Sequence, residues 1–465
     1  GRPVAWTETR SENFVAAAHA RDQIDYVEAA VLSRGKVTAV RVTAICDLGA
    51  YYQYVNPVMG MLTGMMIPGT YDIPNCAYEL RSVLTNKTPV GAYRGAGRPE
   101  ATYLLECLMD KVAHELGLDP AEVRRVNFVP EHRFPHKTPF GADYDSGAYE
   151  KALDRALEAA DYPRLRAEQA AARAEGRLVG IGLSAYVEVC GPGPWESATV
   201  RVEPGASVTV HTGLSPHGQG TATSLSQIVG EALGVPLDRI AVHHGDTAKT
   251  PTGVGTFGSR GMAVGGGAMA VAARQVREKV VRIAAHLLES APDDVQLSDG
   301  QWSVAGTERG VSLEQVAAAA YGGNVPPGDE PGLESTHFFT PSGSVYPFGV
   351  HIAVVEIDPD TGRVEWQRFV AVDDVGNVIN PLLLDGQRHG GIVQGYGQAL
   401  CERVMYDADG QLLTGTLGDY ALPTAHGLPP FELHRTVTPT DRNPLGAKGV
   451  GEAGTIGSTP TLRNA

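Results

Sequence analysis

The sequence predicts an α+β protein made of two mixed α/β lobes with a ligand held between them. Segments of alternating apolar residues, typical of β-strands, recur along the chain between segments of helical periodicity. Glycine-rich turns repeatedly separate the two kinds of segment. Two charged amphipathic segments end at Glu175-Gly176, and we take this point as the boundary between a first lobe, 1–175, and a second lobe, 176–465.

The elements expected in the first lobe follow from these patterns. Arg34-Gly35 suits the turn of a hairpin, Pro99 suits the first position of a helix, and Gly117 ends that helix before Asp119-Pro120 opens the next. The expected elements are a hairpin over 26–32 and 36–50, a strand near 78–84, a helix over 101–116 and amphipathic helices over 148–160 and 164–174.

The second lobe begins with strands and continues with longer helices. Ser259 precedes the longest helical segment, and we expect its side chain to cap that helix. The expected elements are strands near 178–189, 198–212, 240–244, 350–357 and 363–372, and helices from about 221 to 233, from 262 to 288 and around 390–398.

The composition excludes several classes of protein. Hydrophobic residues make up 43% of the 465 positions and charged residues 20%, which is typical of a globular protein. The net charge of −15 argues against nucleic acid or an anionic membrane as a partner, since both attract basic surfaces. The sequence holds no apolar run long enough for a membrane span.

The cysteines indicate a reducing environment. They are odd in number, scattered, and never spaced as CxxC, which predicts reduced thiols and a cytoplasmic location. Zinc and iron–sulfur clusters require clustered thiolates, so the chain offers a site for neither. The five positions are Cys46, Cys76, Cys107, Cys190 and Cys401.

Glu452 is the leading candidate for a catalytic group. It lies in the glycine-rich stretch 445–458, where Lys448 is the one residue of opposite charge. Glycines let the backbone approach a ligand closely. A carboxylate in such a dry pocket is expected to have a raised pKa, in the range of a general base.

Several segments share a glycine-rich turn that opens onto a helix. The turns contain Gly95, Gly218–Gly220, Gly258-Ser259 and Gly454–Thr459. Helix N-termini offer N–H groups and the positive end of a dipole, which suit phosphate. Arg94, Gln219 and Gln394 lie in or near these segments, so the pattern predicts a phosphorylated heterocycle bound mainly by backbone groups.

Other motifs give weaker signals. The two GxGxxG matches, 253–258 and 449–454, lack the strand and helix context of a dinucleotide fingerprint, so an NAD-dependent dehydrogenase is disfavoured. The sequence has no GK[ST] phosphate loop and no GxSxG nucleophile elbow. Prolines around Glu131, His132 and His136 favour a surface loop over a metal site, and His243-His244 suits strand packing.

Six motifs together resemble the molybdenum-binding subunit of the xanthine oxidase/aldehyde oxidase family. The likeness is closer to the carbon monoxide dehydrogenase large-chain-like branch, and it runs in the family's order over nearly the whole chain. The motifs are GAYRGAGRPEA (91–101), SPHGQGT (215–221), GTFGSRG (255–261), DDVGNVINP (373–381), GGIVQGYGQ (390–398) and AKGVGEAGTIGS (447–458).

The resemblance implies a molybdopterin cofactor, in bacterial members usually the cytosine dinucleotide. It implies that the pterin's sulfurs hold the metal, so the chain supplies no metal ligand, and that Glu452 is the catalytic base beside the metal. The residues implied to bind the cofactor are Arg94, Gly95, Gly218, Gln219, Gly220, Thr221, Gly258, Ser259, Arg260, Gln394, Lys448, Gly449, Val450 and Gly451.

Two departures from the family pattern shape the functional expectation. Members that oxidise carbon monoxide carry a cysteine after the Tyr-Arg pair, where this chain has Gly95, so we expect an aldehyde or an aromatic N-heterocycle as substrate. An earlier region of the family's large subunit, with a Phe-containing glycine-rich segment and a Gln near the metal, has no counterpart here, so either the subunit is split or this is a fragment.

The resemblance also implies partners. The chain has no iron–sulfur or flavin motif, so subunits carrying [2Fe–2S] clusters and FAD are expected, together with a polypeptide that supplies the missing N-terminal part. The rival hypothesis is a catalytically inert scaffold that keeps the fold with an incomplete site. Retention of Glu452, Gln219 and Arg94 argues against the scaffold, and loss of the earlier region argues for it.

Overall fold

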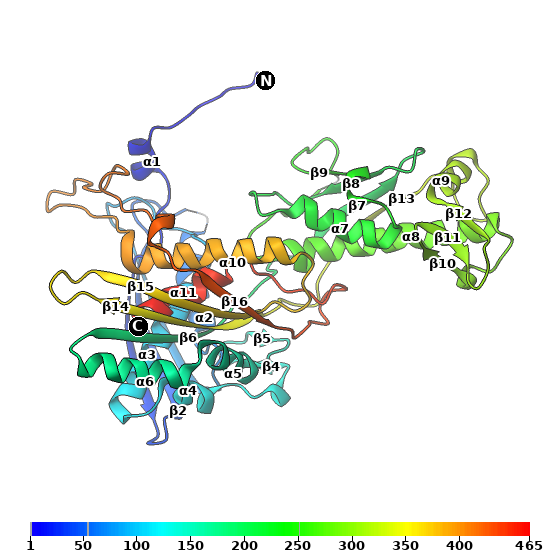
Figure 1. The fold of residues 1–465 in the computed structure, drawn as a ribbon. Helices are drawn as coiled ribbons and strands as arrows, with labels where there is room; N and C mark the ends of the chain where they lie inside the picture. Colours follow the sequence, from blue (N-terminus) through cyan, green and yellow to red (C-terminus); the bar gives the residue numbers. More distant parts are fainter. Residues whose placement is uncertain (1, 54, 251) are drawn as a thin grey trace.

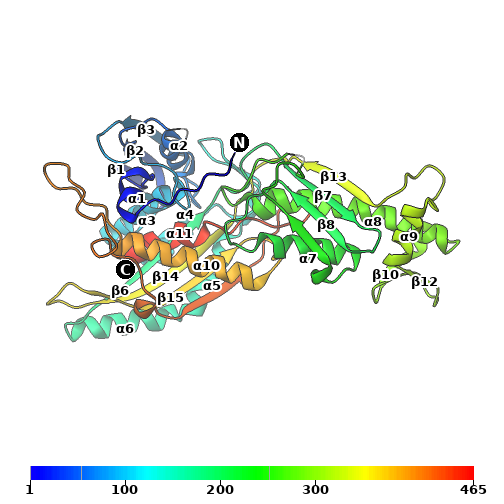
Figure 2. The same cartoon turned by 90° about the horizontal axis from the view of Figure 1, so that it is seen from above.

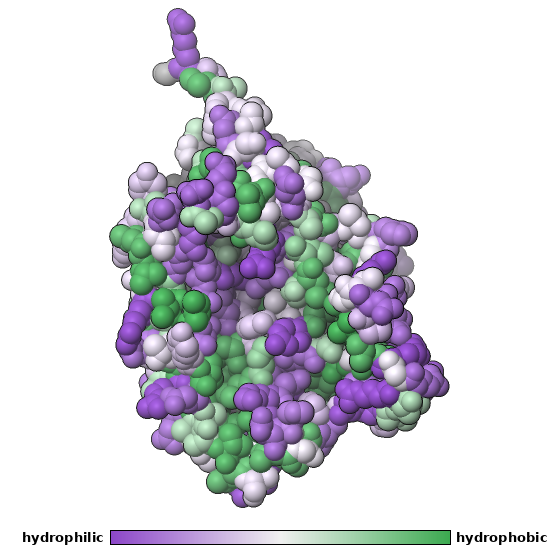
Figure 3. Space-filling model, turned by 90° about the vertical axis from the view of Figure 1, so that its left-hand side faces the viewer, coloured by the Kyte–Doolittle hydropathy of each residue, from purple (hydrophilic) through white to green (hydrophobic). Residues whose placement is uncertain are grey.

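The computed structural model describes residues 2–53, 55–250 and 252–465. The molecule is elongated: a larger α/β body lies at one end and an arm extends from it, as Figure 1 shows. The N-terminal segment before α1 (Arg10–Ala16) is extended, without regular secondary structure, and points away from the body. Figure 3 shows hydrophobic and hydrophilic side chains intermixed on the end of the body that faces away from the arm.

A four-stranded sheet forms the centre of the body. Its strand order is β16-β15-β14-β6; β16 runs parallel to β15, and the other neighbours are antiparallel. Side chains of alternate residues reach two cores, because successive residues of a strand face opposite sides. The strands are β6 (Leu178–Val187), β14 (Phe348–Ile357), β15 (Val364–Asp374) and β16 (Phe431–Thr436).

Helices cover both faces of this sheet. On one face, Val350 and Ile352 pack in a core that includes Leu153 of α5 (Tyr149–Ala160). On the other face, Ala353 packs with residues of α10 (Pro381–Tyr396) and α11 (Ala453–Asn464), which lie side by side in Figure 2. The buried helix α11 therefore carries the stretch after Glu452 into the centre of the body.

The N-terminal part adds a smaller sheet to the body. Strand β2 pairs antiparallel with β1 and parallel with β3, and the predicted hairpin is confirmed. Gly97 and Gly117 flank α3 in left-handed conformations, and the Asp119 carboxylate accepts a bond from the Ala121 N–H to cap α4, as predicted. The elements are β1 (Gln23–Val31), β2 (Val37–Asp47), α2 (Asn56–Met66), β3 (Asn75–Val83), α3 (Arg98–Leu116), α4 (Pro120–Asn127), β4 (His136–Lys137), β5 (Asp143–Tyr144) and α6 (Tyr162–Ala174).

The arm is a second α/β layer with a small unit at its tip. Its sheet has the order β13-β7-β8-β9, with α7 and α8 packed on it. The single strand expected over 198–212 is two strands, because Glu203 and Ser207 close a turn around Pro204-Gly205. The elements are β7 (Glu196–Val202), β8 (Val208–Thr212), α7 (Thr221–Leu233), β9 (Ile240–His243), α8 (Gly267–Leu287), β10 (Val295–Ser298), β11 (Gln301–Val304), β12 (Gly310–Ser312), α9 (Leu313–Gly322) and β13 (Glu334–Phe339).

Two features bear on the predicted organisation. The expected capping of α8 by Ser259 is wrong: a π-helical segment, Gly261–Gly266, precedes α8, and Ser259 has a left-handed φ of 52°. One hydrophobic core contains Tyr149 and Leu153 together with Ile181 and Val350, so side chains from both sides of 175/176 are packed together. The division into lobes at that point stays a prediction.

None of the helices in the described ranges combines the length and apolar character that a membrane crossing requires.

Candidate functional site

A cavity of about 1640 Å³ opens where the body, the N-terminal part and the arm meet. Its walls combine apolar side chains with many polar and charged ones, as suits a large polar organic ligand, and its volume exceeds that of a usual drug-sized pocket. Most of the predicted site residues line it: Arg94, Gly218, Gln219, Thr221, Gly258, Ser259, Gln394, Lys448, Gly449, Val450, Gly451 and Glu452.

Several helices begin at this cavity. Helices α3, α7 and α11 and the π-helical segment before α8 each start there, and none has a side-chain hydrogen bond at its N-cap. Their first N–H groups have no acceptor within the helix itself. The predicted clustering of glycine-rich helix starts is therefore present in the fold, with one correction: Gly454–Thr459 lies inside α11 and does not precede it.

The turn before α7 is built for close approach. Gly218 has a φ of 93°, a backbone conformation that favours glycine. A Cβ added there would meet no atom within 4 Å, so the conformation and not lack of space calls for glycine at this position. Gly220, the N-cap, has a φ of 81°, and a Cβ there would lie 2.5 Å from a methyl carbon of Leu383. Gln219 folds back on this turn, where its Oε1 accepts a bond from the His217 N–H.

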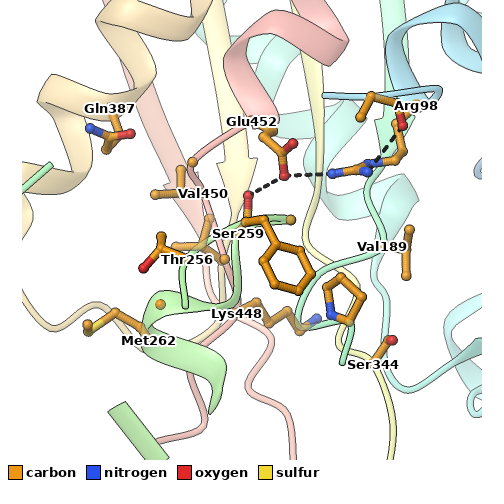
Figure 4. A pocket seen from close by; sticks show the side chains of 18 of the residues that line it. Arg98, Val189, Thr256, Ser259, Met262, Ser344, Gln387, Lys448, Val450 and Glu452 are labelled. Carbon is orange, nitrogen blue, oxygen red and sulfur yellow. Dashed lines mark hydrogen bonds and ion pairs between the residues drawn. The ribbon is translucent and has the colours of Figure 1, made fainter. Parts of the chain in front are cut away.

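Glu452 lies at the cavity wall and is held by three donors. Its Oε1 accepts a bond from the Gly95 N–H at 3.0 Å, and its Oε2 accepts bonds from Ser259 Oγ at 2.8 Å and Arg98 Nη2 at 2.6 Å. Figure 4 shows Glu452 between Ser259 and Arg98. The side chain is 14% exposed, so it keeps access to the cavity.

The expectation of a raised pKa at Glu452 is wrong for the chain by itself. Burial raises the pKa, but the Arg98 guanidinium and the bonds from Ser259 and Gly95 outweigh burial and lower it. The positive charge beside Glu452 is Arg98, whereas the sequence indicates Lys448. Lys448 instead donates to the Tyr346 carbonyl at 3.2 Å, and its ammonium lies 5.3 Å from the centre of the Phe348 ring.

Two residues that sequence reasoning missed complete this cluster. Arg98, on the first turn of α3, contacts Glu452, and its Nη2 lies 3.8 Å from Oε1 of Glu188, a residue directly after β6. Glu188 is fully buried. Burial, together with the negative charge of Glu452, raises the pKa of Glu188 to about 8, against the opposing effect of Arg98. Arg98 belongs to the GAYRGAGRPEA motif, but nothing in the sequence shows how far its side chain reaches.

Arg94 connects three segments at the cavity. Its Nε donates to the Gly451 carbonyl, its Nη1 donates to Gln394 Oε1 at 2.9 Å, and its Nη2 donates to the Gln387 carbonyl at 3.1 Å. The guanidinium thereby fixes the loop that carries Glu452 against α10. Gln394 is thereby held through its amide oxygen.

Three predicted cofactor residues lie behind the cavity lining. Gly95 holds Glu452 through its N–H, and Gly220 begins α7. Arg260 is fully buried: its guanidinium donates to Glu196 Oε2 at 2.6 Å and also to the carbonyls of Pro192, Trp195 and Gly255. This pairing anchors the loop that precedes Ser259, so Arg260 supports the site from behind.

The polar clusters outside the cavity have structural roles. His243 stacks on His211 between neighbouring strands, with ring centres 5.2 Å apart, as expected of strand packing. Glu131 and His132 lie on an exposed turn, as expected, whereas His136 is buried in β4, so the expected surface loop is wrong at that residue. The described ranges contain no group of three or more His, Cys, Asp or Glu side chains arranged to hold a metal ion.

The fold and the site define a cofactor-binding α/β protein, and comparison with known proteins gives its class. Models of the molybdopterin cofactor-binding domain match residues 1–128 and 155–429. The chain belongs to the molybdenum-binding large subunits of the xanthine oxidase family and resembles carbon monoxide dehydrogenase large chains. Relatives of this class carry the names of a dehydrogenase and a hydroxylase.

The names of individual relatives refer to several different substrates. The carbon monoxide dehydrogenase large chain of Hydrogenophaga pseudoflava is 42% identical over 99% of this chain and 60% of its own length. The nicotine 6-hydroxylase large subunit of Paenarthrobacter nicotinovorans is 38% identical over all of this chain and 59% of its own length. The crystal structure of quinoline 2-oxidoreductase from Pseudomonas putida 86 matches with a TM-score of 0.94 at 38% identity, covering 99% of this chain and 61% of that one. The chain thus spans about 60% of the relatives it matches.

The residues present fit a molybdopterin group. The uncapped N-terminus of α7 suits a phosphate of such a cofactor, and several glycines line the cavity. At Gly449 the backbones are already in contact, since an added Cβ would lie 2.3 Å from the Ser259 carbonyl oxygen. The fit needs no metal ligand from the chain, because a pterin brings its own sulfurs.

Proposed function

We propose that this chain is the catalytic part of a molybdenum hydroxylase that oxidises an aldehyde or an aromatic N-heterocycle with water as the source of oxygen. The observation that carries the proposal is the position of Glu452. A carboxylate oriented by three donors lies at the wall of a large cavity at which several uncapped helix N-termini meet.

The cofactor we propose is molybdopterin in its cytosine dinucleotide form. The turn at Gly218–Thr221 is the candidate phosphate site, and Gln394 and the 448–451 segment are candidate pterin contacts. The cavity volume of about 1640 Å³ leaves room for a dinucleotide form. When bound, this group supplies the metal and accepts the two electrons of the oxidation.

Glu452 would act as the general base. The Ser259 hydroxyl and the Gly95 N–H fix the direction of its carboxylate, which keeps the proton acceptor in place during the reaction. Arg98 holds the carboxylate ionised before the reaction, since it lowers the Glu452 pKa. Apolar groups such as Val189, Met262 and Val450 restrict water around it.

Gly95 argues against carbon monoxide as the substrate. A cysteine side chain at this position would put its Cβ 2.3 Å from Cγ of Pro99, and the φ of 101° is a backbone conformation that disfavours any side chain. The local structure is thus formed around a glycine. This supports a substrate other than carbon monoxide, although the carbon monoxide dehydrogenase large chains are among the similar relatives.

Electrons must leave the reduced cofactor, so we propose partner subunits that carry [2Fe–2S] clusters and FAD, in a cytoplasmic complex. Relatives are described as a large chain, a large subunit and a complex subunit gamma, which supports a multi-subunit assembly. A polypeptide or segment corresponding to the remaining 40% of the relatives would complete the molybdenum subunit.

The decisive experiment is metal and nucleotide analysis of the purified native complex, followed by a substrate screen. We expect molybdenum near one atom per chain, a released cytosine nucleotide, and turnover of aldehydes or N-heterocycles. A complex with all of its segments but no molybdenum would favour the inert scaffold, and turnover of carbon monoxide alone would contradict the substrate class.

A further inference from the structure

Glu188 is a second carboxyl group behind Glu452, on the side away from the cavity. Its side chain has no exposed surface, whereas the Glu452 side chain is 14% exposed. Nη2 of Arg98 lies 2.6 Å from Oε2 of Glu452 and 3.8 Å from Oε1 of Glu188. One guanidinium nitrogen thus lies near two carboxyl groups, of which only Glu452 faces the cavity.

The two carboxyl groups are stabilised unequally. Glu452 accepts three hydrogen bonds, whereas Glu188 has only weak contacts with the Cys190 and Ser259 side chains and no hydrogen bond of normal geometry among the described residues. An ionised carboxylate that is buried without hydrogen bonds is strongly unfavourable. Neither nearby arginine pairs closely with Glu188, since Arg98 bonds Glu452 and Arg94 donates to Gly451, Gln394 and Gln387. The cluster therefore favours one proton for two carboxyl groups, held on Glu188.

We propose that Glu188 is a positioning residue whose charge, transmitted through Arg98, sets the basicity of Glu452. The proposal rests on the function proposed above, in which Glu452 is the base. While Glu188 is neutral, Arg98 interacts fully with Glu452 and makes it a weak base. Once Glu188 ionises, it attracts Arg98 and adds a second negative charge nearby, so Glu452 becomes a stronger base.

The groups that face Glu188 support this assignment. Arg98 on α3 and Arg94 in the preceding loop stay positively charged at any ordinary pH. Burial raises the pKa values of Cys190 and Tyr186 far above neutrality, so both stay uncharged, and Tyr186 donates to Asp373. Glu452 is already ionised. Glu188, whose pKa burial raises to about 8, is left as the group of this cluster that titrates near neutral pH.

The test compares the pH dependence of kcat in the isolated, cofactor-loaded complex between wild type and Glu188→Gln. In wild type, kcat should rise through an ionisation near pH 8, as Glu188 loses its proton. The glutamine imitates the protonated form, so this step should disappear while the ionisation of Glu452 at lower pH remains. Infrared difference spectra over the same range provide a readout independent of turnover: a protonated-carboxyl band should vanish above that pH in wild type and be absent from the variant.

Glu106→Gln is the matched control. Glu106 is also fully buried beside an arginine, with its Oε2 2.8 Å from Nε of Arg124, but it lies outside the cavity lining. The Glu106→Gln variant should lose stability. It should keep the ionisation near pH 8 in its kcat profile and the infrared band of protonated Glu188. If the Glu188→Gln protein does not fold well enough to be purified, the wild-type kcat profile still tests the proposal, because a profile without an ionisation near pH 8 overturns it.

The outcomes separate this proposal from the general one. A wild-type profile without an ionisation near pH 8, or a step that persists in Glu188→Gln, overturns the role of Glu188 while the molybdenum hydroxylase assignment stands. Full activity in Glu452→Gln would overturn the proposed function and, with it, this inference. Loss of the step in Glu106→Gln as well would show that general destabilisation, and not Glu188, causes the effect.

Discussion

At the scale of single residues, the proposed function depends on a carboxylate whose direction and charge are fixed by its neighbours. We predict that Glu452→Gln keeps its cofactor but loses turnover by several orders of magnitude, on the order of 10²–10⁴ for the base alone and more with its electrostatic effect. The amide oxygen can still accept from the Gly95 N–H, and the amide nitrogen can donate to the Ser259 hydroxyl, so the fold should persist although Arg98 loses its acceptor. Steady-state kinetics and molybdenum content measure the two effects separately. Near-normal turnover would rule out Glu452 as the base, and Glu115→Gln, an exposed site, is the control.

A second residue-scale prediction concerns Gly95→Cys. The change should not give carbon monoxide oxidation, because the added Cβ would overlap Pro99 and displace the start of α3, which carries Arg98. We expect a loss of stability of about 1–3 kcal/mol and a lowered cofactor content. Gly117→Cys is the control: it has a similar left-handed φ, 64°, and no atom within 4 Å of the added Cβ. Denaturant unfolding of both variants separates steric overlap from backbone strain, and equal losses would contradict the steric argument.

At the scale of elements, the sequence predicted the helix starts better than the contacts between them. Glycine and proline restrict the backbone locally, so the turns at Gly97, Gly117 and Gly220 could be located from the sequence. The pairing of Glu452 with Arg98 could not, because it depends on how α3 and α11 pack after the chain has folded. For the same reason, the sequence indicates Lys448 as the opposite charge and Ser259 as a helix cap, whereas in the fold Lys448 donates to the Tyr346 carbonyl and Ser259 donates to Glu452.

The short elements of the arm were missed for a different reason. Strands such as β10 and β12 have four residues or fewer, too few to show a periodicity of their own. Their packing on α8 holds them in place, as the burial of Trp302 in the core of the arm indicates.

The element-scale prediction concerns the loop before Ser259. Glu196 accepts bonds from Arg260 and from the N–H groups of Val254 and Gly255, so it holds this loop through three contacts. Glu196→Ala should lower the free energy of unfolding by about 3–5 kcal/mol, because Arg260 would remain buried without its partner. It should also lose cofactor. Glu106→Ala removes a comparable pair outside the cavity and should lose stability with less effect on cofactor content per folded chain. Equal cofactor loss in both variants would argue against a specific role of the loop.

At the scale of the whole molecule, the cavity depends on the joining of the body, the N-terminal part and the arm, since its lining residues come from all three. The chain spans about 60% of the relatives it matches, so we expect the remaining part to add further walls. The N-terminal part and the core of the body already share packed side chains, which makes the described ranges a coherent unit for stability measurements.

Asp373 connects the central sheet to the helix above it. Its carboxylate accepts bonds from Arg388 Nε of α10 at 2.6 Å, from His351 Nε2 of β14 at 2.8 Å and from the Tyr186 hydroxyl of β6 at 2.6 Å. Burial by itself raises the pKa of Asp373, but Arg388 and His351 lower it far below its usual value. The folded state therefore binds the proton more weakly than the unfolded state. The stabilising effect is present above the unfolded pKa of about 4 and is lost as the pH falls below it.

We predict that Asp373→Asn destabilises the whole chain by about 3–5 kcal/mol at neutral pH, because it leaves the fully buried Arg388 without its countercharge. The variant should also lose part of the decline in stability that wild type shows below about pH 4, so the two unfolding curves should converge in acid. Thermal and denaturant unfolding at several pH values measure both effects. Asp72→Asn, which removes an exposed pair with Arg133, is the control and should change stability by less than about 1 kcal/mol. A constant difference between Asp373→Asn and wild type down to acid pH would show that shape, and not charge, accounts for the contribution of Asp373.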